Sequence, residues 1–200
     1  MAAEPVNIHM IDLTAACQRT ADVVANVTDD QLTAPTPCEK MRLKELVGHI
    51  GILAQAFAAA ARKDFGPMTD TPPADDAPLD DNWRTAHPRQ LADLARAWQL
   101  PAAWEGMTRA GGIDFPGEVG GLIALTEVVL HGWDVARAIG VPYDADAATT
   151  QACLEYLGQF DPAGTEGMFG PAVSLPEDAP AFDRVVALSG RDPGWGSGVG

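Results

Sequence analysis

The stretch Glu127-Val-Val-Leu-His131-Gly-Trp-Asp134 decides how this chain of 200 residues is interpreted. It lies inside residues 116–139, a segment with the apolar periodicity of one long helix. Side chains three or four positions apart share one face of a helix, so Glu127, His131 and Asp134 should point the same way. Three such groups on a buried face are costly unless something compensates them, and a divalent metal ion would pair with all of them at once.

The helix predicted over residues 116–139 has two distinct faces, and neither is typical of a solvent-exposed surface. One face is an apolar stripe of Leu122, Leu125, Val129, Trp133 and Ala136. The opposite face sets small residues beside the three polar ones, and these small residues are Gly120, Ala124 and Ala138. We therefore expect this helix at the centre of a bundle, with a gap for a ligand along its polar face.

Helical periodicity also dominates the rest of the chain and predicts an all-α fold. Further helices fit roughly residues 8–27, 42–62, 88–109, 145–160 and 181–189, and Pro101 should interrupt the third of them. Strand-like alternation is hard to find. Three segments should be surface loops or a flexible tail because they are rich in Pro, Asp or Gly: 65–81, 158–180 and 194–200.

Composition narrows the classes of function. The chain carries 13 Lys and Arg against 28 Asp and Glu, and its formal net charge of −15 repels nucleic-acid phosphates and anionic membranes. The three cysteines, Cys17, Cys38 and Cys153, do not indicate a disulfide framework, which favours a reducing compartment. There is no run of 18 uninterrupted apolar residues and no basic-then-apolar leader. We expect a cytoplasmic protein that binds neither nucleic acid nor membrane.

The histidines decide whether a complete metal site can form. Two imidazoles and one carboxylate are typical of a catalytic site, because one coordination position stays open for water or substrate. His49, at the edge of the second helix's apolar stripe, is the best partner for Glu127 and His131. His9, near the start of the first helix, and His87, which precedes a proline, are expected to be surface residues. The alternative from spacing alone is a simple i,i+4 pair without a metal ion.

Several motifs together resemble the DinB/YfiT-like superfamily of metal-binding four-helix bundles. They are Thr36-Pro37-Cys38, Leu46-Val47-Gly48-His49, the stretch Glu127 to Asp134 with the Val-Ala-Arg-Ala that follows it, and Phe182-Asp-Arg-Val-Val-Ala-Leu-Ser-Gly190-Arg191-Asp192-Pro193. They are most similar to the actinobacterial branch related to mycothiol-dependent maleylpyruvate isomerase. The resemblance implies a DinB-like bundle over residues 1–145 and an extension of short C-terminal helices packed on it over residues 146–200.

The resemblance also implies a metal centre. In such proteins a divalent ion, usually zinc, is held by a His of the second helix and by the Glu and His of the Glu-x-x-x-His helix. These positions correspond here to His49, Glu127 and His131. Nickel and iron are also compatible with imidazole ligands. One departure is visible, because Met41 stands where the group usually has Trp, which loosens the aromatic wall near the start of the second helix.

The implied chemistry is the addition of a low-molecular-weight thiol, mycothiol or bacillithiol, to an electrophilic substrate, with the metal ionising the thiol. The expected function is therefore a mycothiol-type transferase or isomerase, as a monomer or homodimer. The alternative is a non-catalytic metal- or ligand-binding protein of the same superfamily.

Three further residues near this centre have open roles. Asp134 should either orient His131, grip substrate, or pair on the helix surface with Arg137. Arg137 could instead face a substrate carboxylate. Cys38 is interpreted as a small apolar residue in a tight connector rather than as a redox group.

Overall fold

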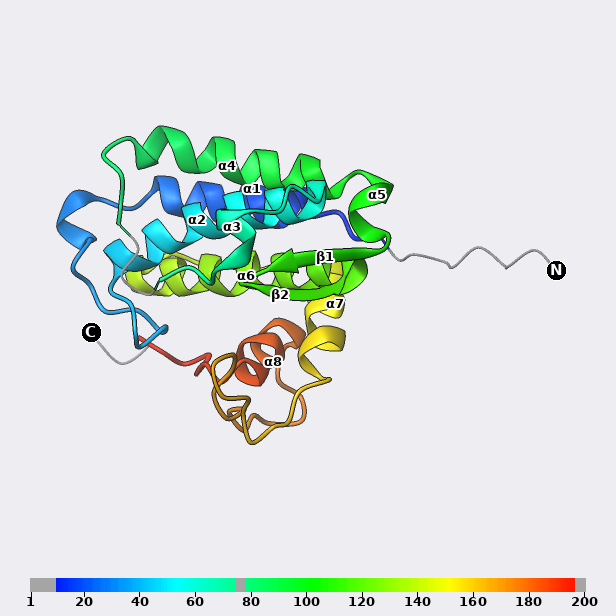
Figure 1. The fold of residues 1–200 in the computed structure, drawn as a ribbon. Coiled ribbons are helices and arrows are strands. Elements are labelled where there is room, and N and C mark those ends of the chain that lie inside the picture. The colour runs from blue at the N-terminus through cyan, green and yellow to red at the C-terminus, as the bar shows by residue number, and fades with distance from the viewer. Residues whose placement is uncertain (1–9, 75–77, 197–200) are drawn as a thin grey trace.

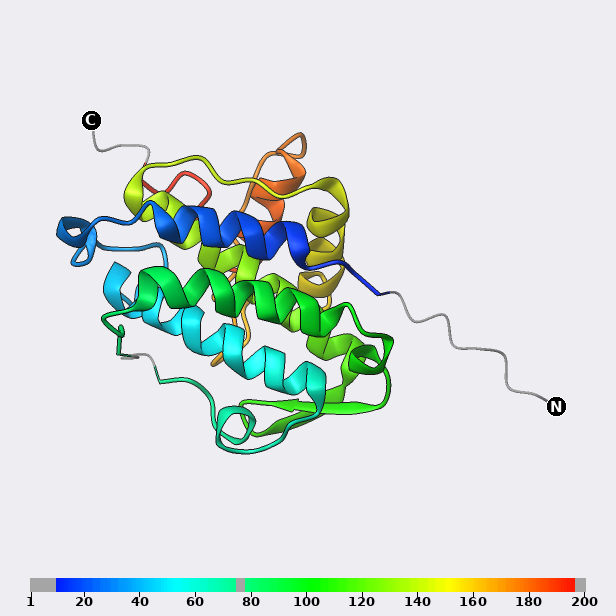
Figure 2. The same ribbon diagram turned by 90° about the horizontal axis from the view of Figure 1, so that it is seen from above.

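Four long helices pack side by side in the computed structural model, which describes residues 10–74 and 78–196. They are α1 (Thr14–Ala25), α2 (Leu43–Arg62), α4 (Trp83–Trp98) and α6 (Gly117–Ile139). Both α1 and α2 contact α4 and α6, so the four helices form a closed ring around one core (Figure 1, Figure 2). The all-α bundle expected from the sequence is confirmed.

Shorter elements surround this ring. They are the 3₁₀ helix η1 (Asp29–Gln31), α3 (Pro67–Asp70), α5 (Pro101–Trp104), the strands β1 (Met107–Ala110) and β2 (Ile113–Pro116), α7 (Ala147–Leu157) and α8 (Ala181–Leu188). Figure 1 shows α7 and α8 below the bundle, and α7 contacts both α6 and α8. The short C-terminal helices are therefore present, while the division of the chain at residue 145 stays a prediction.

The two helices that carry the candidate site are the ones with the clearest sequence signals. The apolar residues of α2 share one face, on which Leu43, Leu46 and Val47 are fully buried. Burying one such side chain contributes about 1.5–3 kcal/mol, so this face holds α2 against its neighbours. The α6 helix ends at Ile139 and is followed by Gly140, whose φ of 73° lies in the left-handed region that glycine adopts without strain.

The α6 helix is long and apolar enough to cross a membrane if length and composition alone are considered. However, 78% of its most apolar window is buried inside the folded chain. Leu125 and Val129, from the predicted apolar stripe, have no exposed surface. This helix is therefore the central helix of the bundle, as its two unusual faces predicted.

Both predicted ends of the helix over residues 88–109 are wrong. The α4 helix begins earlier, at Trp83, and continues through Pro88. The Trp83 side chain is only 5% exposed, and the free energy gained by its burial in the core outweighs the cost of the helix hydrogen bond that Pro88 cannot donate. The helix then stops at Trp98, and the short α5 begins at Pro101, as the expected interruption at this proline indicated.

A β-hairpin replaces the end of that predicted helix. Strands β1 and β2 pair antiparallel, and they are joined by Gly111 and Gly112, whose φ angles are 59° and 77°. Two successive positive angles are typical of the tight turn of a hairpin, so the glycine pair is a hairpin turn and not the predicted helix end. The fully buried Thr108 donates its hydroxyl to the Ala60 carbonyl oxygen at 2.6 Å, which fixes the hairpin against α2.

The first helix and the first loop also differ from expectation. The α1 helix begins at Thr14, whose backbone N–H donates to Asp12 at 2.8 Å. Residues 8 and 9 of the predicted helix, and residues 197–200 of the predicted flexible tail, lie outside the described residues. The loop expected to be exposed over 65–81 contains α3, and its Thr69 side chain is fully buried.

Candidate metal centre

The three proposed metal ligands come together in the folded chain. His49 comes from the middle of α2, and Glu127 and His131 come from the facing side of α6. One potential ligand atom from each lies within 4.8 Å of the other two. The two imidazole rings meet edge to face, with centroids 5.1 Å apart and an interplanar angle of 86°. Packing of α2 on α6 therefore brings His49 next to the pair on α6.

A chain of polar contacts orients His131. Its Nε2 lies 3.1 Å from a Glu127 carboxylate oxygen, and its Nδ1 lies 3.0 Å from an Asp134 carboxylate oxygen. The second contact fixes the plane of the ring, so Nε2 faces the space shared with His49 and Glu127. Carboxylate partners on the far nitrogen are common for histidines that bind metals, because they hold the ring and increase its basicity.

Asp134 is held in turn by Arg191, from the segment after α8. The Nε and one terminal nitrogen of Arg191 each donate to a separate oxygen of Asp134 at 2.8 Å. The other terminal nitrogen donates to the Ser189 hydroxyl at 3.2 Å. Asp134 has no exposed surface, so this two-point contact supplies the charge that its buried carboxylate needs.

The position of Asp134 settles one of the alternatives for this residue. Its carboxylate pairs with Arg191 inside the protein and not on the helix surface, where the alternative with Arg137 had placed it. Arg137 instead donates from its Nε to the Trp195 carbonyl oxygen at 3.0 Å. Asp134 therefore contacts both His131 and Arg191. No role was assigned to Arg191 from the sequence, although it lies inside the C-terminal motif that carried the resemblance.

The same contacts shift the pKa values of His131, Glu127 and Asp134. Burial lowers the pKa of His131, but hydrogen bonds to Asp134 and Glu127 outweigh it and raise this pKa to about 9. Burial raises the pKa of Glu127, and the neighbouring His131 more than reverses this, so the net shift is downward. For Asp134 burial is likewise outweighed, chiefly by Arg191, and its pKa is lowered. Without a metal ion, His131 is thus a cation between two carboxylates at neutral pH.

The chemistry and spacing of these donors fit a divalent ion. Zinc lies about 2.0–2.2 Å from imidazole nitrogen and carboxylate oxygen, so two ligands of one ion are roughly 3–4 Å apart. The 3.1 Å between His131 and Glu127 meets this, and a potential ligand atom of His49 lies within 4.8 Å of both. A bound divalent ion would take the position of the His131 proton and would add one positive charge to the centre, which an anionic ligand such as a thiolate would balance.

A second donor set overlaps the first. Cys38 has its sulfur within 4.8 Å of donor atoms of His131 and Asp134. Both oxygens of Asp134 already accept from Arg191, and one also accepts from His131, so this set is the poorer one for a metal. Cys38 is nevertheless closer to the candidate centre than its interpretation as an apolar connector residue suggests, because it also lines the adjacent cavity.

The candidate centre opens into a cavity of about 440 Å³, within the size range of small-molecule sites. His49, Glu127 and His131 lie in its wall, together with apolar residues of α2 and α6, and the hairpin, α3 and the loop before α8 also contribute. The ligand gap predicted along Gly120, Ala124 and Ala138 is wrong. None of these residues lines the cavity, and a Cβ at Gly120 would lie 2.7 Å from the Thr108 side chain.

One histidine expected at the surface is in the core. His87 is only 5% exposed, and its Nε2 lies 2.9 Å from the Val47 carbonyl oxygen. Gly51 of α2 lies against the same ring, since a Cβ there would be 2.4 Å from it. Burial lowers the pKa of His87, so it packs as a neutral ring between α2 and α4. His9 lies outside the described residues.

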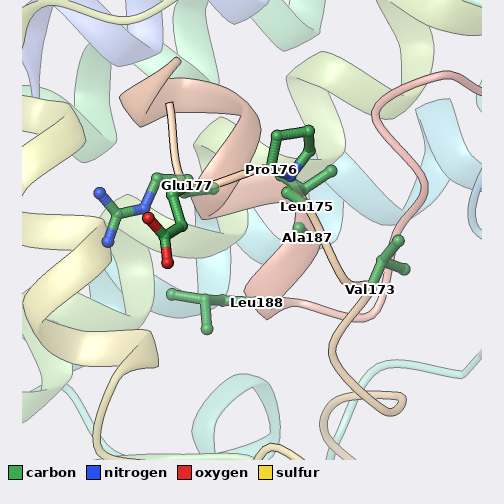
Figure 3. Close-up of a pocket in the computed structure, with 7 residues that line it drawn as sticks. Val173, Leu175, Pro176, Glu177, Ala187 and Leu188 are labelled. Atoms are coloured by element: carbon green, nitrogen blue, oxygen red, sulfur yellow. The ribbon is translucent and has the colours of Figure 1, made fainter. Parts of the chain in front are cut away.

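A separate hollow lies on the C-terminal extension, beside α8 (Figure 3). Its volume is about 360 Å³, and Figure 3 shows Leu175, Pro176 and Leu188 around it, with the Glu177 carboxylate at one end. None of the proposed metal ligands contributes to this hollow. Of these two hollows, the cavity beside α2 and α6 is therefore the one that contains the proposed metal ligands.

Comparison with known proteins places the chain in a family. Residues 13–136 match the family model of the mycothiol maleylpyruvate isomerase N-terminal domain. The chain belongs to this family. The match spans more than half of the chain and includes all four long helices except the last residues of α6. The likeness to this branch of DinB-like proteins, inferred from the motifs, is confirmed.

Individual relatives add the extent of the similarity. Two uncharacterised proteins of Mycobacterium tuberculosis, from strains CDC 1551 / Oshkosh and ATCC 25618 / H37Rv, are each 27% identical over 188 residues, which is 90% of this chain and 98% of theirs. Two solved structures of mycothiol-dependent maleylpyruvate isomerase, one of them a histidine-to-alanine mutant, are 19% identical with TM-scores of 0.54 and 0.56. Each match covers 73% of this chain and 68% of the chain in the solved structure, and at this identity it shows the fold alone.

Proposed function

We propose that this protein is a divalent-metal-dependent enzyme that joins a low-molecular-weight thiol of the mycothiol type to a small electrophile, as an isomerase or S-transferase. The observation that carries the proposal is the set of His49, Glu127 and His131 at the base of a cavity large enough for a small molecule. Two imidazoles and one carboxylate leave a coordination position open, which is typical of catalytic centres. Membership of the family supports the choice of thiol.

Each residue of the centre has a defined task in this proposal. His49, Glu127 and His131 would hold the ion, with zinc as the first choice and nickel or iron also compatible. When bound, the ion would lower the pKa of a coordinating thiol and so supply a nucleophile at neutral pH. Asp134 holds His131 in the orientation that presents Nε2, and Arg191 holds Asp134. These two residues position the centre, and Arg191 also lies in the cavity wall.

A second function is favoured by one observation. The charges of the centre balance without a metal, because protonated His131 and Arg191 face the two carboxylates. A non-catalytic metal- or ligand-binding protein is therefore the alternative. The expected partners are in either case small molecules, and the net charge of −15 argues against nucleic acid. A cytoplasmic location and a monomeric or homodimeric state belong to the same proposal.

Titration calorimetry separates the two functions. Mycothiol, bacillithiol and glutathione are titrated separately into zinc-loaded protein and into protein from which the metal has been removed. The proposal expects saturable binding of mycothiol to the loaded protein only, followed by turnover when an electrophile is added. Absence of heat with all three thiols in metal-loaded protein would favour the non-catalytic binder instead.

A further inference from the structure

The wall of the cavity beside the candidate centre is apolar over most of its area. Residues from four separate elements contribute aliphatic or aromatic side chains to it. They include Leu53 and Phe57 of α2, Phe115 of β2, Ile123 and Leu130 of α6, and Phe169 of the loop before α8. Such a wall offers dispersion contacts and few hydrogen bonds, so it favours a ligand that gains by leaving water.

The rim of the cavity is apolar as well. Met68 of α3, Ile113 of β2 and Met168 of the loop before α8 are exposed at 41%, 67% and 53%, and all three line this cavity. Large apolar side chains that remain exposed around one opening are typical of a site that binds an apolar ligand or surface. Methionine at two of these positions can adapt to ligands of different shape.

Positive charge is scarce at this cavity. Among the described residues that line it, Arg191 is the one Lys or Arg. Each of the three nitrogens of its guanidinium already donates to Asp134 or Ser189. The segments outside the described residues contain no Lys or Arg in their sequence. A ligand with two carboxylates would therefore find no cation at the wall that is not already paired.

The net charge of the centre with a metal ion and a thiolate bound also disfavours an anionic ligand. Glu127, Asp134 and a bound thiolate carry three negative charges, and a divalent ion and Arg191 carry three positive ones. The centre is then neutral, so it does not attract an anion into the cavity. Two carboxylates brought into an apolar cavity would lose their hydration without compensation, which is costly.

Resting on the proposed thiol-dependent function, we infer that the electrophile accepted by this site is an uncharged, largely apolar molecule rather than a dicarboxylate such as maleylpyruvate. The reaction is then an S-transfer to carbon. The thiolate sulfur forms a bond to the electrophilic carbon, the leaving group departs with the electron pair of the bond that breaks, and the thiol proton passes to solvent. The apolar wall holds the electrophile, and its exclusion of water protects it from hydrolysis.

Ligand preference can be measured without turnover, with two unreactive probes. The neutral aromatic 1,3-dinitrobenzene and the dianion maleate are titrated by calorimetry into the full chain, with zinc and without it. We expect dinitrobenzene to bind at least about tenfold more tightly than maleate in both forms. Equal or tighter binding of maleate in the metal-free form, where it cannot coordinate zinc, would overturn the inference, and so would failure of dinitrobenzene to bind.

Two variants locate the binding to this cavity. Ile123→Trp should fill part of the cavity and weaken dinitrobenzene binding at least about tenfold, whereas Leu122→Trp, one residue along α6 and absent from the cavity wall, should leave it unchanged. Ile113→Arg, at an exposed rim position where folding is not at risk, should strengthen maleate binding. Equal effects of the two Trp variants, or no gain for maleate with Ile113→Arg, would contradict the assignment.

The outcomes for this inference and for the proposed function are separate. Failure of mycothiol to bind metal-loaded protein would remove the thiol-dependent function, while the probe titrations would still report what the cavity prefers. Binding of mycothiol together with tight binding of maleate would keep the proposed function and overturn the inferred substrate class.

Discussion

At the scale of single residues, the centre depends on a carboxylate that never meets solvent. Asp134 joins His131 of the candidate metal set to Arg191 of the C-terminal segment, through contacts of 3.0 and 2.8 Å. Its own pKa is lowered mainly by Arg191, so it remains ionised and keeps the His131 ring in place. The orientation of one ligand is therefore set by residues that would not touch the metal.

Replacement of Asp134 tests this positioning role. Asp134→Asn keeps the shape of the side chain but removes its charge, and we expect zinc affinity to fall by roughly 10–100-fold. The measurement is competition with a chromophoric chelator at pH 7. Asp93→Asn, at a partly exposed carboxylate in α4, serves as control and should leave zinc affinity unchanged. An affinity for the Asp134 variant equal to that of the control would contradict the role.

His87 predicts a dependence of stability on pH. Its pKa is lowered in the folded protein by burial, so below about pH 6.5 the unfolded chain binds a proton that the folded chain resists. Its contribution to stability is thus present above pH 6.5 and is lost as the pH falls. His131 acts in the opposite sense, because the folded metal-free protein binds its proton more tightly than the unfolded chain does. Its contribution to stability is fully present below about pH 6.5 and is lost as the pH rises through about 9.

Comparison with a non-titrating variant isolates the contribution of His87. Urea unfolding of metal-free wild type and of His87→Gln is measured between pH 5 and pH 8. The stability of the wild type relative to the variant should decrease as the pH falls below about 6.5, because only the wild type must keep this ring neutral. A difference between the two proteins that is constant across this range would show that His87 does not titrate as its burial implies.

At the scale of elements, the position of α2 decides whether His49 reaches His131. The close approach of α2 and α4 requires Gly51, because a Cβ there would lie 2.4 Å from the His87 ring. That ring is held by its contact with the Val47 carbonyl oxygen, so it cannot easily yield. The spacing of these two helices is therefore fixed by a glycine that sits two residues after a proposed metal ligand.

An alanine substitution tests this packing. Gly51→Ala should destabilise the protein by about 1–3 kcal/mol, because overpacking outweighs the better helix propensity of alanine. Gly66→Ala is the matched control, since a Cβ at Gly66 meets no atom within 4 Å and its φ of 166° is extended backbone. Thermal unfolding of both variants gives the comparison. Unchanged stability of Gly51→Ala would show that the helices separate at little cost.

Elements with a long periodic pattern were the ones that the sequence predicted well. Segments 42–62 and 116–139 match α2 and α6 within one residue at each end, because each buries a continuous apolar face. The hairpin was missed because each strand has four residues, too few for a pattern, and because Gly111-Gly112 fits a helix end as well as a turn. The start of α4 was predicted at Pro88 because proline favours the first turn of a helix. Burial of Trp83 in the core overrides this preference of Pro88 and extends the helix.

The site was predicted in part for the same physical reasons. Glu127 and His131 lie on one helix, so their spacing alone places them together, and the position of His49 at the edge of an apolar stripe, together with the resemblance to the family, added the third ligand. Arg191 is 57 residues from Asp134, and no local pattern reports a contact across that separation. The cavity does adjoin Glu127 and His131, but the small residues predicted to line it do not, because small residues also serve close packing, as Gly120 does against Thr108.

At the scale of the whole molecule, one buried ion pair ties the C-terminal segment to the bundle. Arg191 follows α8, and its side chain is 13% exposed while that of Asp134 is fully buried. Removal of one partner of such a pair leaves the other charge buried without compensation. The extension after α7 thus supports the candidate centre in addition to lining its cavity.

Arginine variants measure how strongly this contact holds the fold. Arg191→Ala should lower the free energy of unfolding by about 3–5 kcal/mol. Arg96→Ala removes a contact with Asp93 in which both side chains are exposed, at 65% and 40%, and should cost less than about 1 kcal/mol. Chemical denaturation of the metal-free proteins provides the values. Similar losses for both variants would mean that the buried pair contributes no more than a surface contact.

The central claim is that His49, Glu127 and His131 hold a metal ion that a thiol can reach, and cobalt(II) absorption tests it most directly. The background is Cys38→Ser, so that the nearby protein sulfur cannot contribute to the spectrum. We predict that mycothiol adds a saturable sulfur-to-cobalt absorption, that Glu127→Gln weakens cobalt binding, and that His49→Ala/His131→Ala retains no cobalt. Undiminished cobalt binding by the double histidine variant, or a spectrum that mycothiol leaves unchanged, would contradict the account.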